Sequence, residues 1–217
     1  MAPYVLPSIV AVTALIDIVA VYREARTVAY VFKPLSTVLI ITLALLAQQA
    51  DRTYQTLIVV GLLFSLAGDV FLMLPERPRS YFVPGLVAFL FAQLVYIGAF
   101  SLGTHWAGIH LVILLPYALF GLVVGTYLWP RLGAMKAPVV LYMIVILGMG
   151  WRAGVRVHAA DVPITGAVFA LVGAVVFILS DLSLAVNRFA RPFKAAEAVI
   201  LSTYFTAQTF IALSLHF

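Results

Sequence analysis

Long apolar runs dominate the chain, and each is bounded by charged residues, proline or glycine. Crossing the hydrocarbon core of a bilayer takes about 20 helical residues. Eight runs come close to that length, and the pattern therefore predicts eight transmembrane helices. The runs cover Tyr4–Tyr22, Lys33–Gln49, Tyr54–Leu74, Phe82–Leu102, Ile109–Trp129, Met135–Trp151, Ile164–Val186 and Ala196–Leu215.

The segments between the runs are too short to hold a soluble domain. We therefore predict an all-α membrane protein in which residues 1–217 form one domain, a single bundle of about eight transmembrane helices. No Lys or Arg precedes the first run, so we expect a retained helix and not a cleaved secretory signal.

Composition agrees with a lipid environment. The chain is 65% hydrophobic and only 10% charged, whereas roughly a quarter of the residues of a soluble protein are charged. The net charge is +5, but the basic residues lie singly or in pairs, which argues against a nucleic-acid partner. Because the chain has no cysteine, disulfides and thiolate metal sites are excluded.

The distribution of basic residues predicts the orientation. Ten of the 13 Lys and Arg residues belong to the odd-numbered loops and their edges, and by the positive-inside rule these loops lie in the cytoplasm and both termini outside. The ten are Arg23, Arg26, Lys33, Arg77, Arg79, Arg131, Lys136, Arg188, Arg191 and Lys194.

A weak internal repeat is visible. An Asp followed three residues later by Leu, with an Ala-Gln pair in the next run, occurs at Asp69 with Gln93 and again at Asp181 with Gln208. The two copies lie four runs apart, which predicts a 4 + 4 parallel internal repeat. Short matches in apolar sequence also arise by chance, so the duplication is a hypothesis.

Three carboxylates fall inside predicted helices: Asp17, Asp69 and Asp181. Each lies six residues before the first residue after its run, which is Arg23, Pro75 or Asn187, or roughly 9 Å from the same face of the membrane. An ionisable group at such a depth is a functional hypothesis by default. The alternative is a cap or an ion pair at the interface, which we favour for Asp17 because Arg23 and Arg26 are near.

For Asp69 and Asp181 we favour a functional role, because small residues beside them permit close helix packing. Gln93 with Tyr96, and Tyr204 with Gln208, share helix faces and are predicted to contact a substrate. The alternative for the glutamines is hydrogen bonding between helices. Lys33 opens the second run and is predicted either to bind a phosphate or neutralise the acids, or to extend to the interface.

The remaining polar residues carry less information. Arg152 and Arg156 lie at the outer end of the sixth run and are interpreted as interface anchors. The sequence has no HExxH, Walker, GxSxG or GxGxxG motif, and no metal or cofactor is expected. The four histidines that show no metal-ligand spacing are His105, His110, His158 and His216.

Several segments resemble the YhhN-like, lysoplasmalogenase family of membrane proteins. They are KPLST at Lys33–Thr37, LLFSLAGDVFLML at Leu62–Leu74, FVPGLVAFLFAQLVYIGAF at Phe82–Phe100, FILSDLSLAVNRF at Phe177–Phe189 and YFTAQTFIAL at Tyr204–Leu213. The likeness covers nearly the whole chain in the same order, and the GD and SD motifs are its most specific part.

The resemblance implies an eight-helix hydrolase of the bacterial inner membrane that cleaves the vinyl ether of lysoplasmalogens, releasing a fatty aldehyde and glycerophosphocholine or glycerophosphoethanolamine. Its partners would be a lysophospholipid substrate and membrane lipids. By motif, Asp69 and Asp181 are the catalytic candidates, and Lys33, Gln93, Tyr204 and Gln208 line the site. One departure puts activity or substrate choice in doubt: a His often stands in the family motif where this chain has Gln93.

The chemistry of the residues agrees with this in outline. Vinyl ether hydrolysis begins with protonation of an alkenyl carbon, and a buried carboxylic acid can supply the proton while a second carboxylate stabilises the cation and activates water. The sequence leaves open which aspartate is the acid. The phosphate would reach a cytoplasmic cation such as Lys33 or Arg191.

Two other functions compete with hydrolysis. The main alternative is a small proton-coupled or cation transporter that uses the intramembrane Asp pair. A lipid-binding or assembly protein without catalysis is the second, and the lack of a large extramembrane domain weakens it.

Overall fold

The computed structural model describes residues 5–48, 50–74, 81–105 and 109–217, and in these it contains eight long helices. All eight are long and apolar enough to cross a membrane, which confirms the predicted helix count. Their bounds are α1 Val5–Tyr22, α2 Arg26–Leu45, α3 Arg52–Met73, α4 Phe82–Ser101, α5 Ile109–Leu128, α6 Lys136–Arg156, α7 Ile164–Ala185 and α8 Ala196–Leu213.

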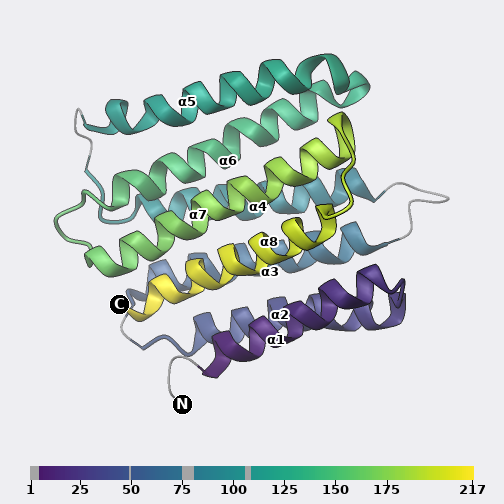
Figure 1. Ribbon diagram of the computed structural model, residues 1–217. Coiled ribbons are helices and arrows are strands. Elements are labelled where there is room, and N and C mark those ends of the chain that lie inside the picture. The colour runs from purple at the N-terminus through teal and green to yellow at the C-terminus, as the bar shows by residue number, and fades with distance from the viewer. Residues whose placement is uncertain (1–4, 49, 75–80, 106–108) are drawn as a thin grey trace.

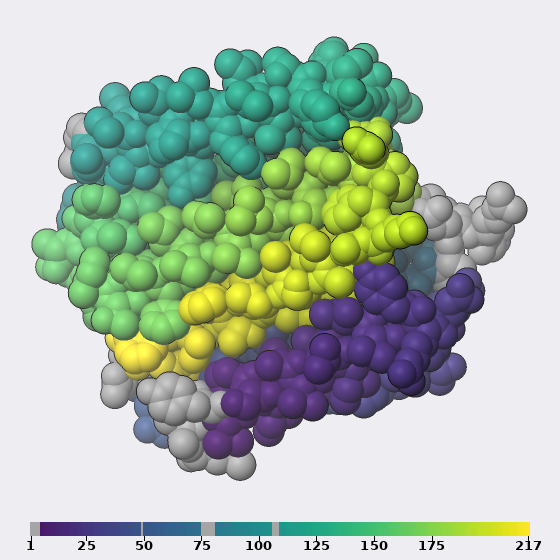
Figure 2. Space-filling view, viewed as in Figure 1, coloured from purple at the N-terminus to yellow at the C-terminus, as the bar shows by residue number. Residues whose placement is uncertain are grey.

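The helices run up and down in one bundle. Helices α1, α8 and α7 form one layer and α2, α3 and α4 the layer behind it, with α6 and then α5 completing one edge (Figure 1). In the space-filling view the first layer forms a broad face with α5 along its border (Figure 2). Because the helix number is even, the start of α1 and the end of α8 lie at the same end of the bundle, with the even-numbered loops (Figure 1).

Helix pairing matches the predicted 4 + 4 repeat in part, since the contact of α1 with α8 has no equally extensive counterpart between α5 and α4. The neighbouring pairs α1–α2 and α3–α4 recur as α5–α6 and α7–α8, and the contact of α4 with α6 recurs as that of α8 with α2. Two glycines repeat as well, since Gly61 and Gly173 each lie eight residues before an aspartate. A Cβ at Gly61 would lie 2.3 Å from the Tyr96 ring, and one at Gly173 would lie 2.7 Å from Ile211. A common origin of the halves remains a prediction.

Helix α2 begins at Arg26, seven residues before the predicted start at Lys33. The prediction began the helix at the charged Lys33, directly before Pro34, but the helix begins two turns earlier and includes Pro34. In a bilayer the backbone must keep its hydrogen bonds within the helix, and a proline there is accommodated by its surroundings. The Ser36 hydroxyl donates to the Phe32 carbonyl at 2.9 Å beside it. Lys33 therefore lies two turns inside the helix, where its side chain reaches the bundle interior.

Candidate active site

One cavity lies among α2, α3, α4, α6, α7 and α8 and extends toward the odd-numbered loops. Most of its lining is apolar, including Leu72, Phe82 and Phe189. The polar and charged residues on its walls are Lys33, Asp69, Tyr142, Ser180, Asp181 and Tyr204. Both aspartates that the sequence marked as catalytic candidates therefore line the same cavity.

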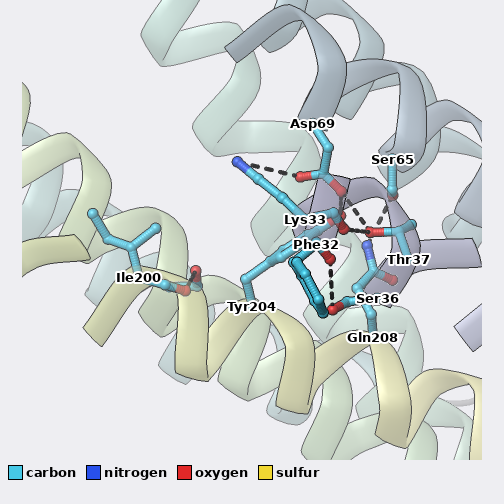
Figure 3. Close-up of polar contacts among 10 residues, drawn as sticks. Phe32, Lys33, Ser36, Thr37, Ser65, Asp69, Ile200, Tyr204 and Gln208 are labelled. Carbon is cyan, nitrogen blue, oxygen red and sulfur yellow. Dashed lines mark hydrogen bonds and ion pairs between the residues drawn. The ribbon is translucent and has the colours of Figure 1, made fainter. Parts of the chain in front are cut away.

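Asp69 is only 1% exposed and is surrounded by donors (Figure 3). Its Oδ2 accepts hydrogen bonds from the hydroxyls of Thr37 and Tyr204, both at 2.7 Å. The ammonium of Lys33 lies 3.6 Å from Oδ1. Donors and a nearby cation both favour the ionised form of a carboxyl group. The arrangement suits Asp69 to act as a fixed carboxylate.

Asp181 has a sparser environment and is half-buried. The hydroxyl of Tyr142 donates a hydrogen bond to its Oδ2. Gln93 Nε2 in turn donates to the Tyr142 oxygen at 3.2 Å, so that α4, α6 and α7 are connected through one chain of hydrogen bonds. Within the described residues no hydrogen bond connects Asp181 to Asp69; each carboxyl has its own tyrosine.

Gln93, Tyr96 and Gln208 are fully buried and are not among the residues that line the cavity. Tyr96 donates to Gln208 Oε1 at 2.8 Å, and Gln208 Nε2 donates to Ser65 Oγ at 2.8 Å. Ser65 precedes Asp69 by one turn on the same face of α3. These side chains lie behind the cavity wall, and their predicted contact with a substrate is untested.

The glycine of the GD motif has a packing role. A Cβ at Gly68 would lie 2.6 Å from the ring of Phe89, a residue that lines the cavity. Ser180 of the SD motif instead donates to the Ile200 carbonyl at 3.0 Å and joins α7 to α8. Each motif thus places its aspartate beside a contact between helices. At Asp69 the contact is the close approach of α3 and α4, and at Asp181 it is the hydrogen bond between α7 and α8.

The interpretation of Asp17 as a cap or an ion pair with Arg23 or Arg26 was wrong. Asp17 is fully buried, and in the described part of the chain neither of its oxygens has a hydrogen-bond or ion-pair partner. The reason is the direction of its side chain, which faces the bundle where Lys33 and Asp69 are the main charges that act on it. Asp17 does not line the cavity.

The basic residues have separate positions. Arg191 is exposed, and Lys33 is the one Lys or Arg among the described residues that lines the cavity. At the other end of the bundle Arg156 is 8% exposed, donates to the Leu102 carbonyl at 2.6 Å and lies over the Tyr54 ring. Arg156 is therefore a buried connection between helices and not the interface anchor that the sequence suggested. The difference follows from α6, which extends to Arg156.

Sequence analysis missed Tyr142. The signal was a tyrosine in an otherwise apolar stretch of α6, VVLYMIVIL, where a hydroxyl needs a partner. No group of three or more His, Cys, Asp or Glu residues converges anywhere in the described residues. The site as observed consists of two carboxyl groups, two tyrosine hydroxyls and one ammonium in an apolar cavity.

Comparison with known proteins places this arrangement in a family. The model of the YhhN family matches residues 28–215, which include every residue of the site. The chain belongs to the YhhN family. The membrane protein YhhN of Shigella flexneri is 29% identical over 215 residues, which cover 95% of this chain and 96% of that protein.

Two human relatives are named as enzymes. The lysoplasmalogenase TMEM86A of Homo sapiens is 41% identical over 162 residues, covering 73% of this chain and 65% of that protein. The lysoplasmalogenase TMEM86B of Homo sapiens is 34% identical over 161 residues, covering 74% and 64%. The chain thus spans about two thirds of the length of these two human relatives. No solved structure matches the chain.

Proposed function

We propose that this chain is a membrane-embedded hydrolase that cleaves the vinyl ether bond of lysoplasmalogens, releasing a fatty aldehyde and glycerophosphocholine or glycerophosphoethanolamine. The observation that carries the proposal is the cavity itself, where Asp69 and Asp181 lie among apolar side chains with a tyrosine hydroxyl on each. The names of the human relatives support it.

The chemistry requires one carboxyl group that donates a proton and one that remains ionised. Protonating an alkenyl carbon creates an oxocarbenium-like cation, which a carboxylate stabilises while it accepts a proton from the attacking water. Apolar surroundings strengthen such charge interactions because little water screens them. Among the described residues, Lys33 is the Lys or Arg that lines the cavity and is available to a substrate phosphate. By the predicted orientation, the cavity faces the cytoplasm.

A transporter is less well supported. A path across the membrane needs polar groups from one side to the other, but the polar network around Asp69 ends near Tyr96. Arg156 and Tyr54 lie toward the other end of the bundle. Between them and this network lie Ile58, Leu62 and Phe100, each 0% exposed. This apolar layer favours a site that is reached from one side.

The test is aldehyde release from lysoplasmalogens by protein purified in detergent. We expect release by the unmodified chain, and a decrease in kcat of about 100-fold or more for Asp69→Asn and for Asp181→Asn. The matched control is Asp17→Asn, which removes a carboxyl at the same depth that does not line the cavity. Equal activity in all three variants, or no aldehyde from the folded protein with either headgroup, would overturn the proposal.

A further inference from the structure

A second cavity meets the first at Asp181. Helices α5, α6 and α7 lie side by side along one edge of the bundle (Figure 1), and a groove open to the surface runs between them. The groove and the main cavity share the lining residues Val139, Tyr142, Asp181 and Ala185. The carboxyl of Asp181 therefore lies at the junction of two spaces of different character.

The two spaces differ in polarity. Apart from Tyr142 and Asp181, the described side chains that line the groove are apolar, among them Phe120, Val124 and Met143. The main cavity additionally has Lys33, Asp69 and Tyr204 on its walls. A lysoplasmalogen has the same division, because its vinyl ether joins a charged glycerophospho group to a single hydrocarbon chain.

We propose that the groove between α5 and α7 binds the alkenyl chain, so that the vinyl ether lies at the junction and Asp181 is the residue that protonates it. This inference rests on the proposed function and names the binding mode of its substrate. Along α5 the groove extends from Leu128 to Phe120, about 12 Å of helix, which holds part of a long chain.

The order of atoms in the substrate agrees with this placement. The carbon that accepts the proton is the second of the chain and faces the groove, whereas the carbon that water attacks carries the ether oxygen and faces the main cavity. Asp181 borders the groove and Asp69 does not. Asp181, with its single tyrosine partner, thus lies beside the hydrocarbon chain of the substrate. Asp69, with two hydroxyl donors and Lys33, lies beside the glycerophospho group.

The step balances. The carboxylic acid of Asp181 gives its proton to the second chain carbon, and the electrons of the double bond form the new C–H bond, which leaves an oxocarbenium ion. Water adds to the first carbon and its surplus proton goes to the Asp69 carboxylate. The hemiacetal then breaks its bond to the glycerol oxygen, which takes the hemiacetal hydroxyl proton. Transfer of the proton from Asp69 through solvent restores Asp181.

Few ionisable groups surround Asp181. Among the described residues, those that line either of its cavities are Lys33 of α2, Asp69 of α3, Tyr142 of α6 and Tyr204 of α8, and the described part of α5 contributes none. Tyr142 touches Asp181 directly and is a positioning residue, while the other three lie across the main cavity. These four groups are the ones whose charge can change proton donation through the two cavities.

The test combines a substitution that narrows the groove with substrates that differ in the length of their hydrocarbon chain. Val124→Trp fills the groove, and the matched control is Val123→Trp on the same helix, where the side chain is 67% exposed to lipid. Chain burial contributes per methylene, so we expect V124W to raise KM about tenfold or more for a hexadecenyl substrate and less than about twofold for a butenyl substrate. V123W should change neither. Equal effects of V124W on both substrates, or none on either, would overturn the binding mode.

A second measurement does not depend on turnover. A saturated-ether lysophospholipid with a diazirine on its chain is photo-crosslinked to the protein, and the labelled peptides are mapped by mass spectrometry. We expect labelling of the groove walls, at Phe120–Leu128 of α5 and at the α6 and α7 residues that line the groove, such as Met143 and Leu182, and we expect V124W but not V123W to reduce it. Labelling only at residues that do not line the groove contradicts the binding mode. Groove labelling without aldehyde release by the wild type would instead refute the proposed function and the role of Asp181, and would leave chain binding in the groove standing.

Discussion

Asp69 and Asp181 hold matching places in the two halves of the chain, yet the groups around them differ. Asp69 is 1% exposed, accepts hydrogen bonds from Thr37 and Tyr204 and has Lys33 beside it. Asp181 is half-buried, has Tyr142 as its hydrogen-bond donor and borders an apolar groove. Donors and cations stabilise a carboxylate, whereas apolar surroundings favour the neutral acid. In the proposed mechanism, these different surroundings prepare two identical residues for opposite tasks.

The largest effect is expected when both carboxyls are removed. If proton donation by Asp181 and stabilisation by Asp69 serve one transition state, the double variant Asp69→Asn/Asp181→Asn should be no more than about tenfold slower than the slower single variant, because residues that act as a unit are not additive. Single-turnover aldehyde release measures this. Losses that multiply across the two single variants would show that the carboxyls act independently.

A smaller effect is expected in the network behind Asp69. Gly61→Ala places a Cβ 2.3 Å from the Tyr96 ring, so that Tyr96 must move away from Gln208. Overpacking of this kind costs about 1–3 kcal/mol. The matched control is Gly98→Ala, which has no atom within 4 Å of its added Cβ. Thermal unfolding in detergent should show a lower midpoint for G61A and an unchanged one for G98A; equal midpoints would contradict the tight α3–α4 contact.

The smallest effect is expected at the third buried carboxyl. Asp17 is fully buried without a hydrogen-bond partner in the described chain, so an isosteric neutral side chain removes a desolvated group and breaks no contact. Asp17→Asn should unfold at the same or a slightly higher temperature, and it should keep aldehyde release within about threefold because Asp17 does not line the cavity. A clear loss of stability would contradict this expectation and would mean that the Asp17 carboxylate stabilises the buried ammonium of Lys33.

Most of the architecture followed from hydropathy, because lipid requires long apolar helices and the charges between them mark the loops. The error at α2 came from beginning the helix at the charged Lys33, whereas the helix starts at Arg26. Asp69, Asp181, Lys33 and Tyr204 were identified for the site because polar groups in apolar helices are few. What the sequence could not supply was pairing between helices: nothing in it connects Tyr142 to Asp181 or turns Asp17 inward, since both depend on how α6 and α1 rotate in the bundle.

The division of roles is tested most directly by the pH profiles of aldehyde release for Tyr142→Phe and Tyr204→Phe. Each change removes a donor that stabilises an ionised carboxylate, so the carboxyl keeps its proton to higher pH. If Asp181 is the acid, Y142F moves the alkaline limb of the profile upward by about one pH unit. If Asp69 is the carboxylate, Y204F moves the acidic limb upward instead. The opposite pairing, an acidic-limb shift in Y142F and an alkaline-limb shift in Y204F, would contradict the assignment.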